Sequence, residues 1–149
     1  MAGRTGSRAN VRAVPEGGGG STAERVLGVG VDLVEIERVE SALARWGRRI
    51  VDRLMAPAES ARLPPEGPER TRAFAEAIAV KEAASKALGT GWTRGVAWRH
   101  VELERGPQPR ALLHEGAARR AAALGARRAR VVELTVRDGL AIAEVWLLV

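Results

Sequence analysis

Two lysines lie five residues apart near the middle of this chain, and they are the only lysines among its 24 basic residues. Lys81 directly precedes Glu82, and Lys86 follows Glu82 by four residues. An ammonium group can give up a proton when its site is tuned, whereas a guanidinium group effectively cannot. The strong preference for arginine elsewhere therefore indicates a task at these lysines that arginine cannot perform.

The simpler interpretation of Glu82 and Lys86 is a solvated surface pair. Residues four apart in a helix share one face, and an ion pair of this kind contributes roughly 0.2–0.5 kcal/mol. Taken alone, the pair favours this structural role. The lysine preference and the sequence around the pair favour a chemical one.

These residues are predicted to end a long helix over residues 69–88. Ala, Leu, Lys and Glu are strong helix formers, and Gly89 and Gly91 supply a C-terminal stop. The helix is rich in alanine. We therefore expect it to pack closely against a sheet.

A strand is predicted over residues 26–32. Gly28 and Gly30 lie two apart on one face of it, which allows another backbone or a ligand to approach closely. Asp32 ends this strand, where its carboxylate can project into a cleft. The alternative for Asp32 is a structural turn or helix-cap aspartate.

A helix is predicted over residues 35–54, with a break near Gly47. One stripe at helical spacing is apolar and is expected to face the core; it comprises Val39, Leu43, Trp46, Ile50 and Leu54. Another stripe carries Arg38, Arg45 and Arg49. It is either a solvated face or a docking surface for an acidic partner.

The remaining elements mix helices and strands without regular alternation. Residues 57–68 are predicted to form a loop, 115–124 a helix, and 98–103, 110–113, 130–136 and 140–149 strands, the last two forming a hairpin. This order favours a single α+β domain over residues 25–149, with an antiparallel sheet packed on the long helix. The polar, glycine-rich residues 1–24 are predicted to be a disordered tail or linker.

Composition narrows the classes of function. The net charge of +6 indicates an anionic partner. Aromatic residues make up only 3% of the chain, which argues against an RNA-binding platform that stacks bases. Cysteine is absent, which excludes a thiolate metal site and fits a cytoplasmic location. No apolar run reaches membrane-spanning length, and neither nucleic acid nor a membrane is expected as a partner.

Two segments resemble one known family. Residues 28–38, Gly-Val-Gly-Val-Asp-Leu-Val-Glu-Ile-Glu-Arg, resemble the opening strand and helix of the holo-acyl-carrier-protein synthases, the small class of phosphopantetheinyl transferases. Residues 81–91 resemble the second signature of that family, K-E-A-x-x-K-A-L-G-T-G. Two motifs in the right order and about fifty residues apart are far more specific than either one alone. The resemblance covers about residues 26–149.

The resemblance implies an α+β fold that forms a homotrimer, with active sites in clefts between protomers. It implies Mg²⁺-dependent transfer of the phosphopantetheine arm of coenzyme A to a serine of an acyl carrier protein, with release of adenosine 3′,5′-bisphosphate. Asp32 and Glu82 match the metal carboxylates of the family, and Lys86 matches the lysine near the transferred phosphate. These three are the expected catalytic residues, while Lys86, Gly89 and Thr135 are expected to bind coenzyme A. The arginine stripe is then expected to dock the acidic carrier protein.

The chain departs from the family pattern in two places. Where the family carries R-F before the second signature, this chain has Ala77-Ile78, and the H-V-S-x-S/T-H strand reads Val-Val-Glu-Leu-Thr-Val at residues 131–136. Losing two charge-assisted hydrogen bonds to a phosphate predicts coenzyme A binding weaker by about two to four powers of ten, unless Arg130, Arg137 or a neighbouring protomer compensates. The alternative function is a catalytically degenerate relative that binds a carrier protein or a partner subunit.

Overall fold

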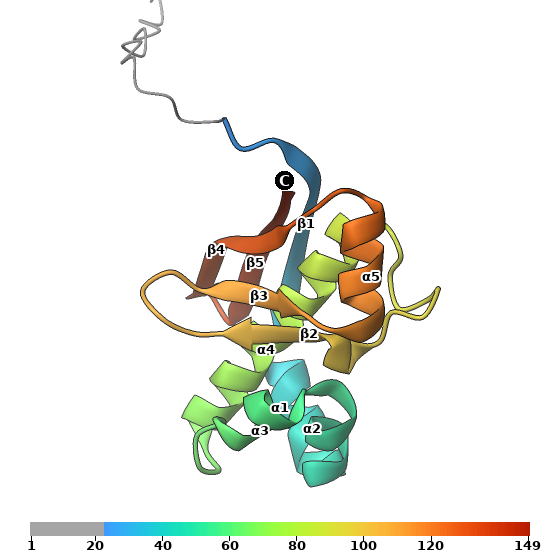
Figure 1. Cartoon of the computed structure of the whole chain (residues 1–149). Helices are drawn as coiled ribbons and strands as arrows, with labels where there is room; N and C mark the ends of the chain where they lie inside the picture. Colours follow the sequence, from blue (N-terminus) through green and yellow to red (C-terminus); the bar gives the residue numbers. More distant parts are fainter. Residues whose placement is uncertain (1–22) are drawn as a thin grey trace, which may run out of the picture.

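The computed structural model describes residues 23–149, so most of the predicted tail lies outside the described residues (Figure 1). Five strands form one antiparallel sheet in the order β1-β5-β4-β3-β2. The strands are β1 (Val26–Glu35), β2 (Val101–Glu104), β3 (Arg110–Leu113), β4 (Arg128–Arg137) and β5 (Leu140–Leu148). The predicted α+β class with an antiparallel sheet is confirmed.

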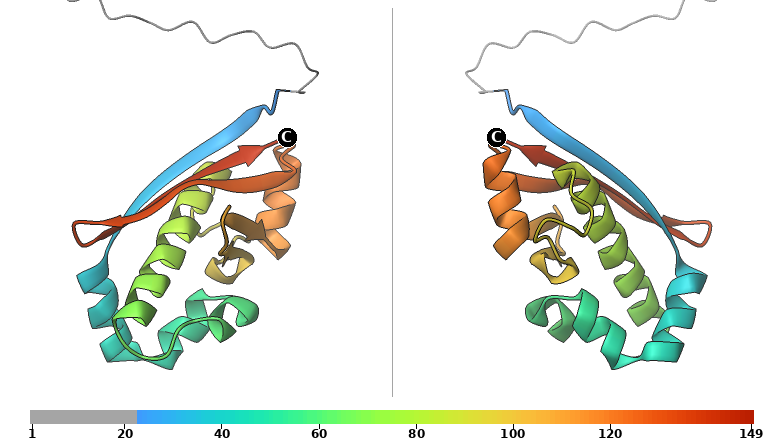
Figure 2. Two further views of the ribbon diagram at one scale, coloured as in Figure 1. Left: turned by 90° about the vertical axis from the view of Figure 1, so that its left-hand side faces the viewer. Right: turned by 90° about the vertical axis from the view of Figure 1, so that its right-hand side faces the viewer.

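Helix α4 (Pro68–Leu88) is the long helix against which this sheet packs, and the long strands β1, β4 and β5 curve along it (Figure 2). It begins with Pro68 in its first turn and ends at Gly89, whose left-handed φ of 68° lets its N–H bond back to the carbonyl of Lys86. Ala79 and Ala83 are completely buried. These small side chains allow the sheet to approach the helix closely.

The predicted close approach at the two glycines of β1 is confirmed. A Cβ atom on Gly28 would lie 2.4 Å from the carbonyl oxygen of Ala87, and one on Gly30 would lie 1.8 Å from that of Ala83. Both distances are far below van der Waals contact. Only glycine therefore lets β1 lie directly on the backbone of α4.

Three shorter helices, α1 (Ile36–Trp46), α2 (Arg48–Leu54) and α3 (Pro57–Ala61), form the part of the molecule opposite the start of β1 (Figure 1). The predicted break falls at Gly47, which has a φ of 51°. Helix α3 corrects the prediction of a loop from residue 57. It forms because Pro57 suits a first helical turn and the carboxylate of Glu59 accepts the N–H of Ala56 at 3.3 Å.

The predicted core stripe of the first helical segment is wrong in part. Val39 is buried, but Trp46 is 46% exposed. Val51 and Met55 are buried in its place. The break at Gly47 separates two helices, so the helical phase of α1 does not continue into α2 and one stripe cannot run through both.

Two strand boundaries also differ from expectation. Strand β1 continues to Glu35, so Asp32 lies within the strand rather than at its end. Residues Trp98–His100 form the 3₁₀ helix η1, and β2 begins only at Val101. The other predicted helix is α5 (Glu115–Ala123), which agrees closely with the sequence pattern.

A β-bulge in β4 decides which side chains face the core. Strands β4 and β5 form a hairpin whose turn contains Asp138 and Gly139, both at positive φ. The register of β4 against β5 shifts between Val131 and Glu133. Val132 is the extra residue and is exposed. Beyond it, Leu134 and Val136 pack against the core. Glu133 and Thr135 consequently face away from α4.

Within residues 23–149, no helix has the combination of length and apolar character that crossing a membrane requires.

Candidate active site

Asp32 and Lys86 meet between β1 and α4. The Nζ atom of Lys86 lies 2.6 Å from Oδ1 of Asp32 and also donates to the carbonyl of Val31 at 3.0 Å. Asp32 faces the helix because it lies two residues after Gly30, on the same side of the strand. Lys86 is half exposed. The ion pair therefore borders solvent, where a ligand can reach it.

Glu82 lies one turn before Lys86 on α4 and is partly buried. The indole Nε1–H of Trp92 donates to its Oε2 atom at 3.3 Å. Burial raises the pKa of the Glu82 carboxyl above its ordinary value, and the negative charge of Asp32 raises it further, against the hydrogen bond from Trp92 and the charge of Lys86. The carboxylates of Asp32 and Glu82 therefore repel one another, and a cation between them would relieve that repulsion.

The donor set at this position fits Mg²⁺. Within residues 23–149 there is no cluster of three or more His, Cys, Asp or Glu side chains that could hold a metal ion. Mg²⁺ does not need one, because it commonly keeps several waters and binds through one or two carboxylates plus substrate phosphates. Asp32 and Glu82 supply that number of carboxylates.

Lys81 does not share this location, although the sequence grouped it with Lys86. Its ammonium is fully buried, pairs with Oε2 of Glu59 at 2.7 Å, and donates to the carbonyls of Trp98 and Val101. Burial lowers the pKa of Lys81, and the charge of Glu59 opposes that shift. Lys81 therefore joins α4 to α3 and β2, and of the two lysines Lys86 is the one that meets Asp32.

The two remaining expected ligand-binding residues lie in different places. Gly89 follows Lys86 by three residues and caps the end of α4. Thr135 lies on the sheet face that points away from α4, paired with Ile142. A single protomer therefore does not bring Thr135 together with Asp32 and Glu82.

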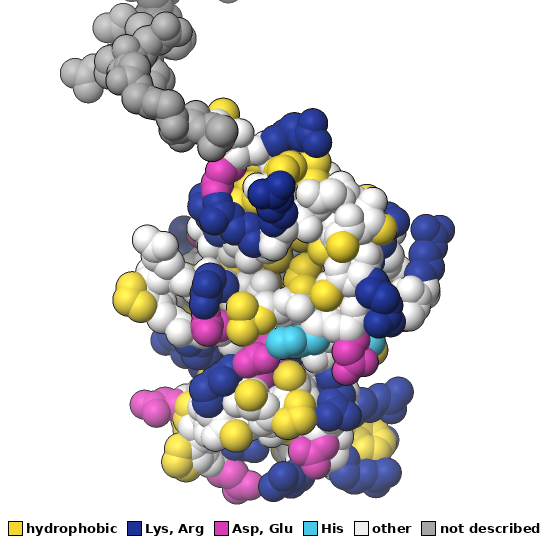
Figure 3. All heavy atoms as spheres, in the orientation of Figure 1, with side chains coloured by type: hydrophobic (Ala, Val, Ile, Leu, Met, Phe, Trp, Pro, Cys, Tyr) yellow, Lys and Arg dark blue, Asp and Glu magenta, His cyan; other side chains and the backbone are white. Residues whose placement is uncertain are grey.

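The predicted docking arginines are all exposed. Arg38 and Arg45 lie on α1 and Arg49 lies on α2, and basic side chains are abundant on this part of the surface (Figure 3). The guanidinium of Arg45 lies 4.8 Å from the centre of the Trp46 ring. This distance is typical of a cation–π contact.

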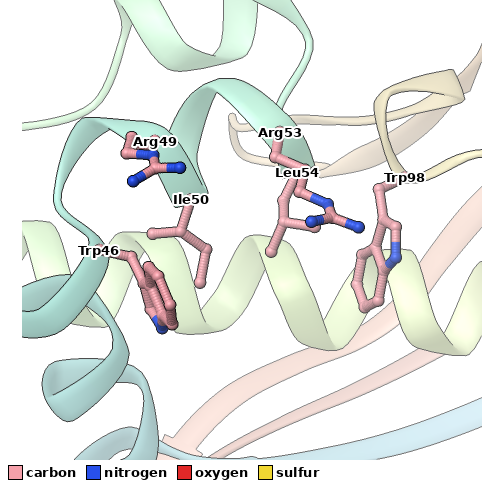
Figure 4. A pocket seen from close by; sticks show the side chains of 6 residues that line it. All are labelled: Trp46, Arg49, Ile50, Arg53, Leu54 and Trp98. Atoms are coloured by element: carbon pink, nitrogen blue, oxygen red, sulfur yellow. The ribbon is translucent and has the colours of Figure 1, made fainter.

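An apolar groove of about 600 Å³ lies beside these arginines (Figure 4). Its walls come from α1, α2 and η1, and they are Trp46, Arg49, Ile50, Arg53, Leu54 and Trp98. This groove was not predicted from the sequence, because the helical pattern placed Trp46 in the core. The contact of Trp92 with Glu82 was not predicted either. The concentration of four tryptophans in a chain with one phenylalanine and no tyrosine was the available signal.

Comparison with known proteins identifies the family. The model of the 4′-phosphopantetheinyl transferase superfamily matches residues 28–140. The holo-[acyl-carrier-protein] synthase of Solidesulfovibrio magneticus is 46% identical over 103 residues, which cover 68% of this chain and 81% of that protein. The chain belongs to the holo-acyl-carrier-protein synthase family. Another member, from Rhizobium rhizogenes, is 38% identical over 128 residues, covering 83% of this chain and 94% of that protein.

Solved structures of holo-acyl-carrier-protein synthases share the fold. The enzyme from Neisseria meningitidis superposes with a TM-score of 0.74 at 22% identity, covering 83% of this chain and 98% of that one. The Helicobacter pylori enzyme, solved in complex with coenzyme A, gives a TM-score of 0.67 at 23% identity, covering 81% of this chain and 99% of that one. The pairing of a long helix with a five-stranded antiparallel sheet is thus the architecture of the family.

Proposed function

We propose that this chain transfers the 4′-phosphopantetheine arm of coenzyme A to a serine of an apo acyl carrier protein. The main support for this proposal is that residues of the two family signatures contact each other in the fold. Asp32 from the first signature contacts Lys86 from the second at 2.6 Å, with Glu82 one helical turn away. The Helicobacter pylori relative, which contains coenzyme A, supports the choice of donor.

In the proposed reaction, the serine oxygen forms a new bond to the phosphorus that carries pantetheine. The bond from that phosphorus to the bridging oxygen breaks, and adenosine 3′,5′-bisphosphate leaves. Asp32 and Glu82 would hold Mg²⁺, which when bound neutralises charge on the pyrophosphate oxygens. Such transfers depend mostly on positioning and charge stabilisation. Lys86 would stabilise the departing phosphate. Glu82, whose pKa is raised, is a carboxylate that can accept the serine proton.

The arginine stripe of Arg38, Arg45 and Arg49 is the proposed docking surface for the carrier protein. Its exposure suits an acidic partner, because opposite charges mainly accelerate association and lose strength as salt is added. The apolar groove lies directly beside the stripe and shares Arg49 with it. Apolar side chains of a docked helix would find a complementary surface there.

We also propose that the active form is a homotrimer in the cytoplasm. The sheet face that points away from α4 exposes Val29, Val31 and Leu33 of β1. Contiguous exposed apolar surface of this kind is typical of an interaction site. Thr135 lies on the same face, so a neighbouring protomer could receive it at its own cleft. This would explain why one protomer separates Thr135 from Asp32.

Two observations favour the alternative function of a non-catalytic binding protein. The strand that holds coenzyme A in the family carries Glu133 here, and Ala77 is buried and has no cationic side chain. Retention of Asp32, Glu82 and Lys86 favours the enzyme, since a pure binding module has no need of metal carboxylates.

The test is Glu82→Gln in a mass-shift assay with coenzyme A, Mg²⁺ and a panel of apo carrier proteins. We expect wild-type protein to add the phosphopantetheine mass and Glu82→Gln to keep its fold and lose the transfer. Glu69→Gln, an exposed position at the far end of the same helix, is the matched control and should remain active. Transfer by Glu82→Gln at ordinary Mg²⁺ concentration would contradict the site assignment, and an inactive wild type would favour the binding protein.

A further inference from the structure

The indole of Trp92 points at the carboxylate of Glu82 and does not itself belong to the proposed metal or phosphate ligands. Its Nε1–H donates to Oε2 of Glu82 at 3.3 Å. We propose that Trp92 is a positioning residue that holds the Glu82 carboxylate in one rotamer, ready for the cation that Asp32 and Glu82 would hold. This inference rests on the proposed function.

A second tryptophan holds the indole of Trp92 in place. The rings of Trp92 and Trp98 stack with their centres 4.1 Å apart and their planes inclined by 20°. The backbone carbonyl of Trp98 accepts a hydrogen bond from the ammonium of Lys81 at 3.2 Å. The tryptophan pair therefore bridges two consecutive residues of α4, Lys81 through Trp98 and Glu82 through Trp92. This closed arrangement fixes the indole relative to the helix that carries its target.

The segment that carries Trp92 is also tied to the end of α4. The backbone N–H groups of Thr90 and Gly91 both donate to the carbonyl of Ser85 at 3.3 Å. The hydroxyl of Thr93 donates to the carbonyl of Thr90 at 2.7 Å. Residues on both sides of Trp92 thus make hydrogen bonds that restrict its backbone, and the indole is preorganised for Glu82 rather than free to turn away.

The chemistry of the indole suits this role. Carboxylates that bind metals are usually held by a further hydrogen bond, and loss of that partner typically costs about 10–100-fold in metal affinity or activity. An indole donates one hydrogen bond and carries no charge. It can therefore orient Glu82 without competing with the cation for the negative charge, as a lysine or arginine would.

The alternative is that Trp92 only fills space beside the core. Trp92→Phe separates the two roles, because it keeps an aromatic ring for the stack and removes the N–H. Trp98→Phe is the matched control, since it changes the same stack but leaves the bond to Glu82. A purely structural role predicts similar behaviour of the two variants.

The experiment measures Mn²⁺ binding by electron paramagnetic resonance on the full chain with coenzyme A present. We expect Trp92→Phe to bind Mn²⁺ about tenfold more weakly than wild type, or worse. Trp98→Phe should stay within about twofold of wild type, since it keeps the Glu82 partner. Trp92→Gln, whose amide N–H can still donate, should bind Mn²⁺ more tightly than Trp92→Phe.

Three outcomes would overturn the inference. They are unchanged Mn²⁺ binding in Trp92→Phe, equal losses in Trp92→Phe and Trp98→Phe, and weaker binding in Trp92→Gln than in Trp92→Phe. Glu82→Gln measured in the same way separates failure of the metal site from failure of the positioning role of Trp92. If Glu82→Gln leaves Mn²⁺ binding intact, the proposed metal site itself fails and the role of Trp92 fails with it. If only the Trp92 variants behave like wild type, the metal site stands and the positioning role falls.

Discussion

At the scale of single residues, Lys81 is a lysine for a structural reason rather than a catalytic one. An ammonium has three N–H donors, and all three have partners here: the carboxylate of Glu59 and the carbonyls of Trp98 and Val101. A guanidinium carries five donors. With three acceptors in this enclosed site, two of the five guanidinium N–H groups would have no partner. The preference for lysine at this position therefore follows from counting donors.

We predict that Lys81→Met lowers the free energy of unfolding by about 3–5 kcal/mol, because it leaves the buried carboxylate of Glu59 without its counter-charge. Urea unfolding followed by circular dichroism measures this loss. Lys86→Met is the control, because its pair with Asp32 is partly exposed and is expected to contribute less than about 1 kcal/mol to stability. Equal stability losses in the two variants would show that Lys81 does not make the buried pair described here.

At the scale of elements, the site depends on how closely β1 lies on α4. Asp32 follows Gly30 by two residues on the same face of the strand, and Lys86 follows Ala83 by three on the helix. The contact of Gly30 with the carbonyl of Ala83 therefore sets the separation at which the Asp32 carboxylate meets the Lys86 ammonium. A side chain at position 30 would push β1 away from α4 and separate Asp32 from Lys86.

We predict that Gly30→Ala destabilises the protein by about 3 kcal/mol or more, because its Cβ atom would meet a backbone oxygen that cannot rotate away. Thermal unfolding and transfer activity should both fall in this variant. Gly106→Ala is the matched control, since a Cβ atom there has no neighbour within 4 Å. It should change stability by less than about 0.5 kcal/mol. A Gly30→Ala variant with wild-type melting temperature would contradict the observed contact.

The break at Gly47 acts at the same scale. It divides one predicted helix into α1 and α2 and changes the direction in which their apolar residues point. Trp46 is thereby exposed beside Ile50 and Leu54, which builds the groove next to the arginine stripe. The surface proposed for the carrier protein is thus a consequence of one glycine.

At the scale of the whole molecule, the side of the sheet that faces away from α4 exposes apolar side chains. Helices α4 and α5 lie on one side of the sheet (Figure 2), and the other side exposes Val29, Val31 and Leu33. A solvated sheet face normally carries polar side chains at such positions. Self-association through this face would cover these side chains and bring Thr135 of one protomer toward another.

We predict that wild-type protein sediments as a trimer and that Leu33→Glu dissociates it, since a charge would be placed on the most exposed apolar residue of the face, 59% exposed. Analytical ultracentrifugation measures the change, and transfer activity should fall while the circular dichroism spectrum of each chain is retained. Ala122→Glu, at an exposed position of α5, is the control and should remain trimeric. A monomeric wild type would refute the trimer.

The sequence alone determined the order and class of the elements apart from α3 and η1, the end of α4 at Gly89, the break at Gly47 and the match of the two signatures to one family. These features depend on local propensity and on short spacings, so residues close together in the sequence are enough to predict them. The close packing at Gly28 and Gly30 was also predictable, because only glycine offers a backbone without a side chain.

Only the tertiary structure decided which partner each functional side chain meets. Lys81 and Lys86 are equivalent in composition, yet one is enclosed with Glu59 and the other reaches Asp32. The face on which Thr135 lies depends on a single extra residue in β4, because one bulged residue inverts strand alternation. The bond from Trp92 to Glu82 joins residues ten positions apart across a turn. Such contacts depend on distances through space, which no local pattern of residues specifies.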